Sequence, residues 1–162
     1  MRPATETDLP EIVSIYNSTV ASRVATADTE EVSCESRLAW FRRHEAEGSP
    51  ILVHEEAGQV VAWTSLSAFY GRPAYQRTAE VGIYIREKFR ERGLGSRLLS
   101  ETIEIASKTG LKVLLAFIFT HNIISLRLFE SRGFEQWGLL PDVAEMDGRQ
   151  YSLLIMGTHI DY

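Results

Sequence analysis

The chain has almost no cysteine, since Cys34 is the only one among 162 residues. A single thiol excludes an internal disulfide and a zinc site built from several cysteines, and it is typical of a reducing compartment. We expect Cys34 to be a small buried apolar residue rather than a nucleophile. Long apolar runs are also missing, so no membrane-spanning helix or signal peptide is predicted, and we expect a cytoplasmic protein.

An excess of positive charge is missing as well. The sequence has 17 Lys and Arg residues against 22 Asp and Glu residues, a net charge of -5. An acidic chain lacks the overall field that nucleic-acid binding requires, so no nucleic-acid partner is predicted. We place His44 and His159 on the surface and His54 in a charged strand, none of them spaced as metal ligands, and predict no metal.

The length fits one domain, residues 1–162, with its own core. The apolar spacing predicts helices over 7–20, with Thr7 as N-cap, and over 33–48, with Ser33 as N-cap and Gly48 after the end. Further segments alternate between β-rich runs and helical patterns, which predicts a mixed α/β fold with a central hairpin meander. The expected strands are 51–56, 60–66, 78–85, 111–119, 134–140 and 149–156, and the expected further helices are 95–110 and 122–134.

The segment "FRERGLGSRLL", residues 89–99, places three arginines and two glycines between a predicted strand and a predicted helix. Free N–H groups and the helix dipole favour an anion at such a helix start, and glycine allows close backbone approach. Each charge there contributes only about 0.3–1 kcal/mol, so a ligand with several anionic oxygens, such as a pyrophosphate, fits best. Solvated surface arginines beside a loop shaped by its glycines are the alternative for an isolated Gly-x-Gly.

The spacing Arg90-x-x-Gly93-x-Gly95 resembles motif A of the GNAT superfamily of acetyl-CoA-dependent N-acetyltransferases. The resemblance continues in "N-x-x-S-x-x-L-F-E-x-x-G-F", which starts at Asn122 and is similar to motif B of that superfamily. The order of the predicted elements agrees along nearly the whole chain. The resemblance implies a single acyl-CoA N-acyltransferase fold, in which helices flank a central, mostly antiparallel sheet.

A closer resemblance is to the phosphinothricin acetyltransferases, carried by "IYN", "WF", "R-x-A-Y-x-x-T-A-E" and "IYI". It implies acetyl-CoA as co-substrate, a small amino-acid-like amine of the phosphinothricin or methionine sulfoximine type as acceptor, and a homodimer. It assigns the pantetheine arm and the pyrophosphate mainly to backbone groups. The implied donor-binding residues are Ile83, Tyr84, Ile85, Glu91, Arg92, Gly93, Leu94, Gly95, Ser96 and Asn122; for Asn122 a helix cap alone is the alternative.

Acetyl transfer to an amine requires a base that removes a proton from the acceptor. Glu80 is the first candidate, because an acid on a half-buried strand should have a raised pKa, and by resemblance it is the general base. A plain ion pair of Glu80 with Arg72 or Arg77 is the alternative. His121, at the end of the strand 111–119, is the second candidate, although a loop histidine at a helix start is more often solvated or capping.

Arg72 and Arg77 could hold an acceptor carboxylate through bidentate hydrogen bonds, with Tyr75 in the same pocket. An ordered surface loop or a dimer contact would explain all three residues equally well. Two departures from the superfamily concern Phe129, where many members have a tyrosine that protonates the thiolate, and Ser152, where relatives often have an aspartate.

Two other functions remain open at this stage. One is a non-catalytic acetyl-CoA-binding module that acts as a sensor. The other is acetylation of a protein or polyamine amine. A protein acceptor is disfavoured because residues 67–77 and the two N-terminal helices look able to enclose the cleft.

Overall fold

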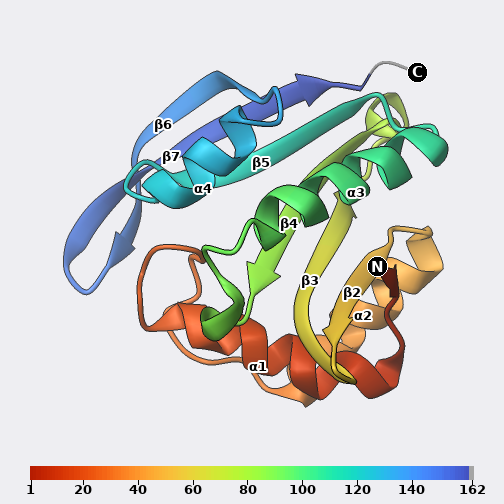
Figure 1. Ribbon diagram of the computed structural model, residues 1–162. Helices are drawn as coiled ribbons and strands as arrows, with labels where there is room; N and C mark the ends of the chain where they lie inside the picture. The colour runs from red at the N-terminus through yellow and green to blue at the C-terminus, as the bar shows by residue number, and fades with distance from the viewer. Residues whose placement is uncertain (161–162) are drawn as a thin grey trace.

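The computed structural model describes residues 1–160, which form a seven-stranded sheet with helices on both faces (Figure 1). The strand order is β1-β2-β3-β4-β5-β7-β6, and only the β4–β5 pair is parallel. Residues 161–162 of the predicted domain lie outside the described residues. The strands are β1 (Arg2–Pro3), β2 (Ile51–Glu56), β3 (Gln59–Ala68), β4 (Thr78–Ile85), β5 (Val113–Phe119), β6 (Glu135–Met146) and β7 (Arg149–His159).

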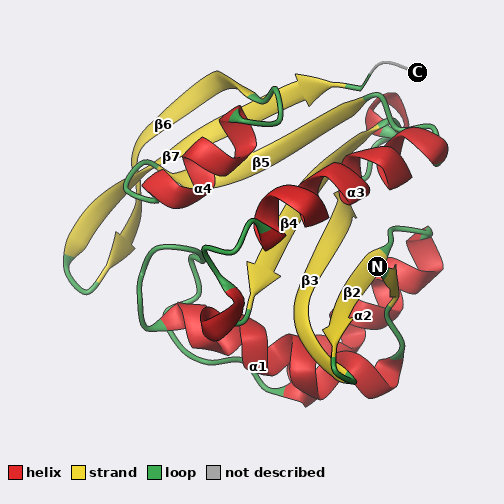
Figure 2. Ribbon diagram, in the orientation of Figure 1, coloured by secondary structure: helices red, strands yellow, loops and turns green. Residues whose placement is uncertain are grey.

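Within residues 1–160, four α-helices cover the sheet, two on each face (Figure 2). The helices are α1 (Leu9–Val20), α2 (Cys34–Glu47), α3 (Leu94–Lys108) and α4 (Ile123–Glu130). Helices α3 and α4 bury Leu99 and Phe129 against β4 and β5, whereas α1 and α2 bury Ile12 and Phe41 against β2 and β3. The mixed, mostly antiparallel architecture predicted from the sequence is confirmed.

Strands β4 and β5 pair over only three residues and then separate. Their parallel register runs from Thr78↔Val113 to Glu80↔Leu115 and stops there. Residues 81–85 of β4 remain bonded to β3 on one edge, and their other edge has no partner strand within residues 1–160. Figure 1 shows the two strands diverging from this point. The sheet is therefore split, and one edge of a central strand is open to a ligand.

Several local predictions hold because short-range chemistry determines them. The Ser33 side chain caps α2 by accepting from Ser36 N, and Gly48 follows the helix at φ 65°. The β2–β3 hairpin turns at Ala57 and Gly58, both with positive φ, as a two-residue hairpin turn requires.

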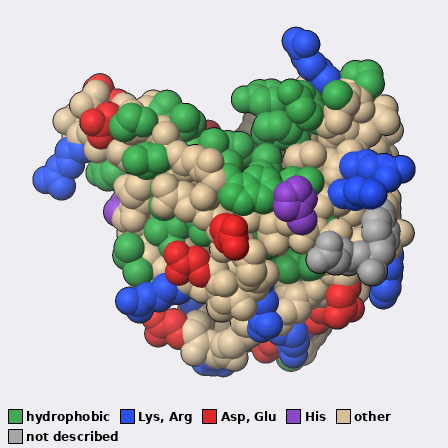
Figure 3. Space-filling model, turned by 90° about the horizontal axis from the view of Figure 1, so that it is seen from above, with side chains coloured by type: hydrophobic (Ala, Val, Ile, Leu, Met, Phe, Trp, Pro, Cys, Tyr) green, Lys and Arg blue, Asp and Glu red, His purple; other side chains and the backbone are tan. Residues whose placement is uncertain are grey.

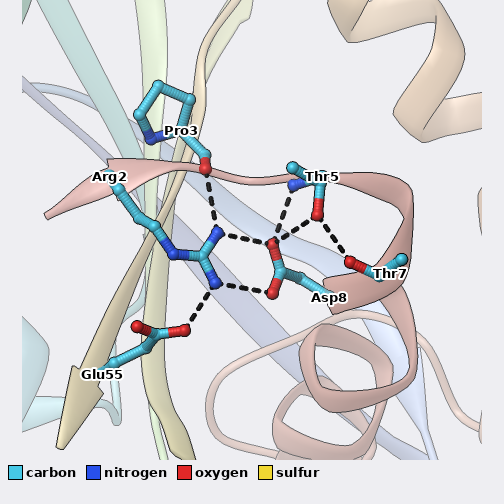
Figure 4. Close-up of polar contacts among 6 residues, drawn as sticks. All are labelled: Arg2, Pro3, Thr5, Thr7, Asp8 and Glu55. Carbon is cyan, nitrogen blue, oxygen red and sulfur yellow. Dashed lines mark hydrogen bonds and ion pairs between the residues drawn. The ribbon is translucent and has the colours of Figure 1, made fainter. Parts of the chain in front are cut away.

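The start of α1 differs from the prediction, because Thr7 is not its cap. Asp8 accepts hydrogen bonds from Thr5 N at 2.8 Å and from Thr5 Oγ1 at 3.1 Å, so a short 3-10 turn over Glu6–Asp8 precedes the helix (Figure 4). Arg2 of β1 holds the same carboxylate with two 2.8 Å hydrogen bonds and also contacts Glu55 of β2 at 2.5 Å. These contacts tie β1, β2 and the start of α1 together.

Two residues lie elsewhere than expected. Cys34 is exposed, not buried, because it is the first residue of α2 and that turn projects away from the core. His44 is buried at 4% exposure, not on the surface, because the last turn of α2 packs over β3, where its ring finds polar partners. Between residues 1 and 160, no helix combines the length and the apolar character that crossing a membrane requires.

Candidate active site

The loop before α3 presents a row of unbonded N–H groups. Gly93 adopts φ 75° at the helix start, and Glu91 also has positive φ. Across residues 91–96 no backbone N–H finds an acceptor in the described part of the chain. Together with the positive end of the α3 dipole, these groups fit an anion with several oxygens.

Close packing brings this loop against the open edge of β4. A Cβ atom on Gly95 would lie 3.3 Å from Ile85 Cδ1 and 3.2 Å from Leu128 Cδ2, so glycine lets α3 approach both β4 and α4. Arg90 Nε donates to the Ile85 carbonyl at 2.8 Å, which holds the loop to the end of the strand.

Arg132, just after α4, donates to Ser96 Oγ in the first turn of α3. The sequence analysis missed this arginine, although it lies inside the second motif. Its guanidinium adds a positive charge at the same end of α3.

Glu80 lies where the sheet splits, because it is the last residue of β4 that pairs with β5. Its carboxylate has no hydrogen-bond or ion-pair partner among residues 1–160, so the predicted alternative of a pair with Arg72 or Arg77 is not formed. The side chain is open to solvent, yet the surrounding protein removes part of the water that would stabilise its charge and thereby raises its pKa.

Aromatic side chains line the same face of the sheet as Glu80. Because side chains alternate along a strand, Gly82 and Tyr84 share this face, with their β3 partners Ser65 and Trp63. Trp63 and Tyr84 stack with ring centroids 4.5 Å apart, and Tyr16 of α1 packs beside them. Burial raises the pKa of Tyr84, so its hydroxyl stays protonated at neutral pH.

His121 lies far from Glu80. It is six residues beyond Leu115, the β5 partner of Glu80, which corresponds to about 20 Å along an extended strand. Its Nε2 lies 2.8 Å from the Arg23 carbonyl and therefore carries the proton of that contact, and its ring packs on Tyr151. The structure does not bring the two candidate bases together.

Asn122 performs the predicted capping role. Its Oδ1 accepts from Ser125 N at 3.2 Å, and its Nδ2 donates to the Val24 carbonyl at 3.3 Å. The side chain thus joins the start of α4 to the loop after α1.

Arg72 and Tyr75 line a cavity of about 370 Å³, together with Leu66 and Ala79. Ala79 precedes Glu80 on β4, so strand alternation turns this cavity toward the opposite face of the sheet. Arg77 is not among its lining residues. The structure therefore does not gather the three predicted acceptor residues around Glu80.

The two departures noted in the sequence have different surroundings. Phe129 is buried against Phe134 and has no proton to give to a thiolate. Ser152 Oγ accepts from Asp142 N at 3.0 Å and lies 3.3 Å from Asp142 Oδ1. No group of three or more histidine, cysteine or acidic side chains suited to a metal occurs in residues 1–160.

A mixed sheet that splits after three residue pairs of parallel β4 and β5, with helices on both faces, is the fold of an acyl-CoA-dependent N-acyltransferase. Residues 12–134 match the Acetyltransferase (GNAT) family, and the chain belongs to that family of acetyl-CoA-dependent N-acetyltransferases.

Relatives and solved structures agree along the whole chain. It is 53% identical to "Putative phosphinothricin acetyltransferase YwnH" of Bacillus subtilis, over 99% of this chain and 98% of the relative. It is 35% identical to the L-methionine sulfoximine/L-methionine sulfone acetyltransferase of Pseudomonas aeruginosa, over 99% of this chain and 94% of that protein. A phosphinothricin acetyltransferase structure from Sinorhizobium meliloti in complex with acetyl-CoA superimposes with a TM-score of 0.92 at 30% identity, covering 98% of this chain and 86% of that one.

Acetyl-CoA is accordingly the co-substrate, and the residues present fit it. The unbonded N–H groups of residues 91–96 suit its pyrophosphate, and the open edge of β4 offers N–H and carbonyl groups to the amides of its pantetheine arm.

Proposed function

We propose that the chain transfers the acetyl group of acetyl-CoA to the amine of a small amino-acid-like acceptor of the phosphinothricin or methionine sulfoximine type. The observation that carries this proposal is the unpaired carboxylate of Glu80 at the inner end of the split between β4 and β5. The names of the Bacillus and Pseudomonas relatives support the acceptor class.

Glu80 acts as the general base in this proposal. An α-amine with a pKa near 8 is roughly a tenth neutral at pH 7, so its deprotonation costs about 1.4 kcal/mol. Glu80 takes one proton from the ammonium form, and the neutral nitrogen bonds to the acetyl carbon. The carbon–sulfur bond then breaks with its electron pair on sulfur, and the second proton that the nitrogen loses as the amide forms ends on that sulfur. Phe129 has no proton to donate, so another group must protonate that sulfur.

The direction of the donor favours Glu80 over His121. A pyrophosphate on Glu91, Arg92, Gly93, Leu94, Gly95 and Ser96 lies at the far end of β4, and a pantetheine arm along Ile83, Tyr84 and Ile85 then leads back toward Glu80. His121, with Asn122, lies at the wide end of the split, and its Nε2 is already bonded to Arg23. We therefore assign His121 and Asn122 to shaping the wide end of the split, where the donor is proposed to bind.

Arg72, Tyr75 and Arg77 remain the proposed partners of the acceptor carboxylate. Their segment connects β3 to β4 at the end of the sheet, so it can extend around that end to the face of Glu80 when an acceptor binds. Replacing Arg72 by Gln should raise the KM for the acceptor about tenfold and leave the KM for acetyl-CoA unchanged. An unchanged acceptor KM removes Arg72 from the site.

We also propose a homodimer. Strand β6 is the last strand of the sheet, and four large apolar side chains on it are exposed: Trp137, Leu139, Leu140 and Val143. Hydrophobic side chains gather on the surface seen in Figure 3, toward which β6 and β7 lie in Figure 1. Burial of such an edge in a second copy would remove it from water.

The decisive experiment measures release of the CoA thiol from acetyl-CoA. The panel comprises phosphinothricin, methionine sulfoximine, methionine sulfone, ordinary amino acids, polyamines and a lysine peptide. A strong rate with the first three compounds is expected. A preference for polyamines or the peptide would contradict the proposed acceptor class, and no release with any amine would contradict transferase activity in this set.

A further inference from the structure

Ser67 lies directly opposite Glu80 in the β3–β4 ladder. Paired residues of antiparallel strands point to the same face, with Cβ atoms about 4.5–5.5 Å apart. The two side chains are not bonded to each other. Ser67 instead lies next to His44 of α2, with its Oγ 3.3 Å from Nε2 of the histidine ring.

The second ring nitrogen of His44 determines the direction of that hydrogen bond. Nδ1 lies 3.1 Å from the Ser49 carbonyl oxygen, which can only accept, so Nδ1 carries the ring proton. Burial lowers the pKa of His44, so the ring is neutral at pH 7 and Nε2 keeps its lone pair. The Ser67 hydroxyl must therefore donate to Nε2.

A hydroxyl that already donates its proton in one hydrogen bond can only accept hydrogen bonds from other groups. Ser67 Oγ is half-buried beside the unpaired carboxylate of Glu80, so two acceptors stand side by side on the sheet face that α1 and α2 cover. This arrangement suits a ligand that presents several N–H donors from one nitrogen, as an ammonium group or a primary amine does.

We propose that Ser67 Oγ binds the acceptor amine by accepting a hydrogen bond from one of its N–H groups, while Glu80 removes another proton. In this proposal His44 is a positioning residue, because its Nε2 accepts the Ser67 hydroxyl proton and leaves the oxygen lone pairs free for the amine. This inference rests on the proposed transferase function. Ser67 retains its hydrogen bond to nitrogen while the nitrogen–carbon bond forms, and so holds the amine beside Glu80.

The test compares Ser67→Ala with Ser67→Thr, using the most active acceptor of the panel. Ser67→Ala should raise the acceptor KM about tenfold and leave the KM for acetyl-CoA unchanged, which corresponds to the loss of one hydrogen bond. Ser67→Thr keeps a hydroxyl and should stay within about threefold of the wild type. Ser18→Ala removes a hydroxyl that bonds only within α1 and is the matched control.

A double-mutant cycle separates positioning from packing. His44→Met fills similar space without accepting from Ser67, so it should raise the acceptor KM, whereas His44→Gln offers an amide oxygen and should restore much of the loss. Combined with Ser67→Ala, His44→Met should add little, because both changes remove the same interaction. A purely structural role of His44 predicts additive losses instead and would overturn the positioning assignment.

The outcomes also distinguish this inference from the proposed function. If the wild type is active, Glu80→Gln is inactive and Ser67→Ala keeps a normal acceptor KM, the role of Ser67 is wrong and the transferase stands. If the wild type releases no thiol with any amine, both proposals fail. If His44→Met does not fold, the comparison of Ser67→Ala with Ser67→Thr still decides the role of the hydroxyl.

Discussion

Among single residues, Glu80 combines two properties that usually exclude one another. Its side chain is open to solvent, as a group that meets a substrate must be, yet its pKa is raised by the protein around it. The combination arises because protein atoms around the carboxylate displace part of the nearby water without covering the side chain itself. A raised pKa makes a carboxylate a stronger base, so this environment suits proton removal from an amine.

Replacement of Glu80 by Gln should lower kcat by about 10²- to 10⁴-fold, the usual contribution of a general base. The KM for acetyl-CoA should not change. Because the ionised form is the active one, the wild-type rate should fall as the pH drops through a pKa above the ordinary glutamate value, and the variant should lack this limb. Steady-state kinetics between pH 4 and 9 measures both effects.

A suitable control is Glu104→Gln, which removes the same charge from the exposed surface of α3. It should leave the pH profile unchanged. Equal rates for Glu80→Gln and the wild type at neutral pH would remove Glu80 as the base.

At the scale of helices and strands, the contacts that hold β1 to the start of α1 make the free energy of unfolding depend on pH. Hydrogen bonds from Arg2 are the main cause that lowers the pKa of Asp8 to about 2. A carboxyl whose folded-state pKa lies below its unfolded value stabilises the fold above the unfolded pKa, near 3.8. That stabilisation is lost as the pH falls through the folded value.

Replacement of Asp8 by Asn should therefore lower the free energy of unfolding at pH 7 by about 1–3 kcal/mol, the usual range for hydrogen bonds to a charged group. The difference from the wild type should shrink between pH 4 and 2. Denaturant titrations at several pH values measure it. The control is Asp147→Asn, whose exposed pair with Arg23 should contribute much less; equal losses in the two variants would contradict the account.

The start of α3 depends on a backbone conformation that glycine allows. Gly93→Ala forces a Cβ into φ 75°, so we expect a destabilisation of about 1 kcal/mol and a higher KM for acetyl-CoA. Gly48→Ala is the matched control, because Gly48 has a similar φ of 65° but ends α2, away from the donor loop. It should show the same loss of stability with an unchanged KM. An equal rise in the KM for acetyl-CoA in both variants would show that the effect of Gly93→Ala does not arise at the loop before α3.

On the scale of the whole molecule, the proposed transfer requires donor and acceptor to meet at Glu80, where the pairing of β4 with β5 ends. One face carries α3, α4 and the loop proposed to bind the donor. The other face carries α1, α2 and the stacked rings of Trp63 and Tyr84. The split opens between them, so a group that lies along β4 can be reached from the opposite face.

The exposed apolar edge of β6 leads to a prediction about assembly. Sedimentation equilibrium should give about twice the chain mass of 18.3 kDa. Leu139→Lys places a charge on the edge and should shift the protein toward the monomer without unfolding it, because Leu139 is 50% exposed in the single chain. The control is Tyr70→Lys, because Tyr70 is a large side chain outside β6 that is even more exposed, at 79%. A monomeric wild type would contradict the dimer.

Sequence-local chemistry accounts for what could be predicted. The cap at Ser33, the hairpin at Ala57 and Gly58 and the glycine loop before α3 depend on residues a few positions apart, so their spacing is visible in the sequence. The family resemblance could be recognised for the same reason, because its motifs are short contiguous segments. Thr7 failed as a cap because Asp8, held by Arg2, moved the start of the turn.

The sequence by itself determined the helices, every strand except the short β1, their order along the chain, the family and the choice of Glu80 as the candidate base. Only the tertiary structure decided which groups stand beside Glu80, namely Leu115, where β4–β5 pairing ends, and Ser67 with the buried ring of His44. It also decided the contact of Arg132 with Ser96 at the start of α3. The physical reason is distance along the chain. Helix caps and turns form between neighbours, whereas strand register and burial depend on packing between segments that no local pattern relates.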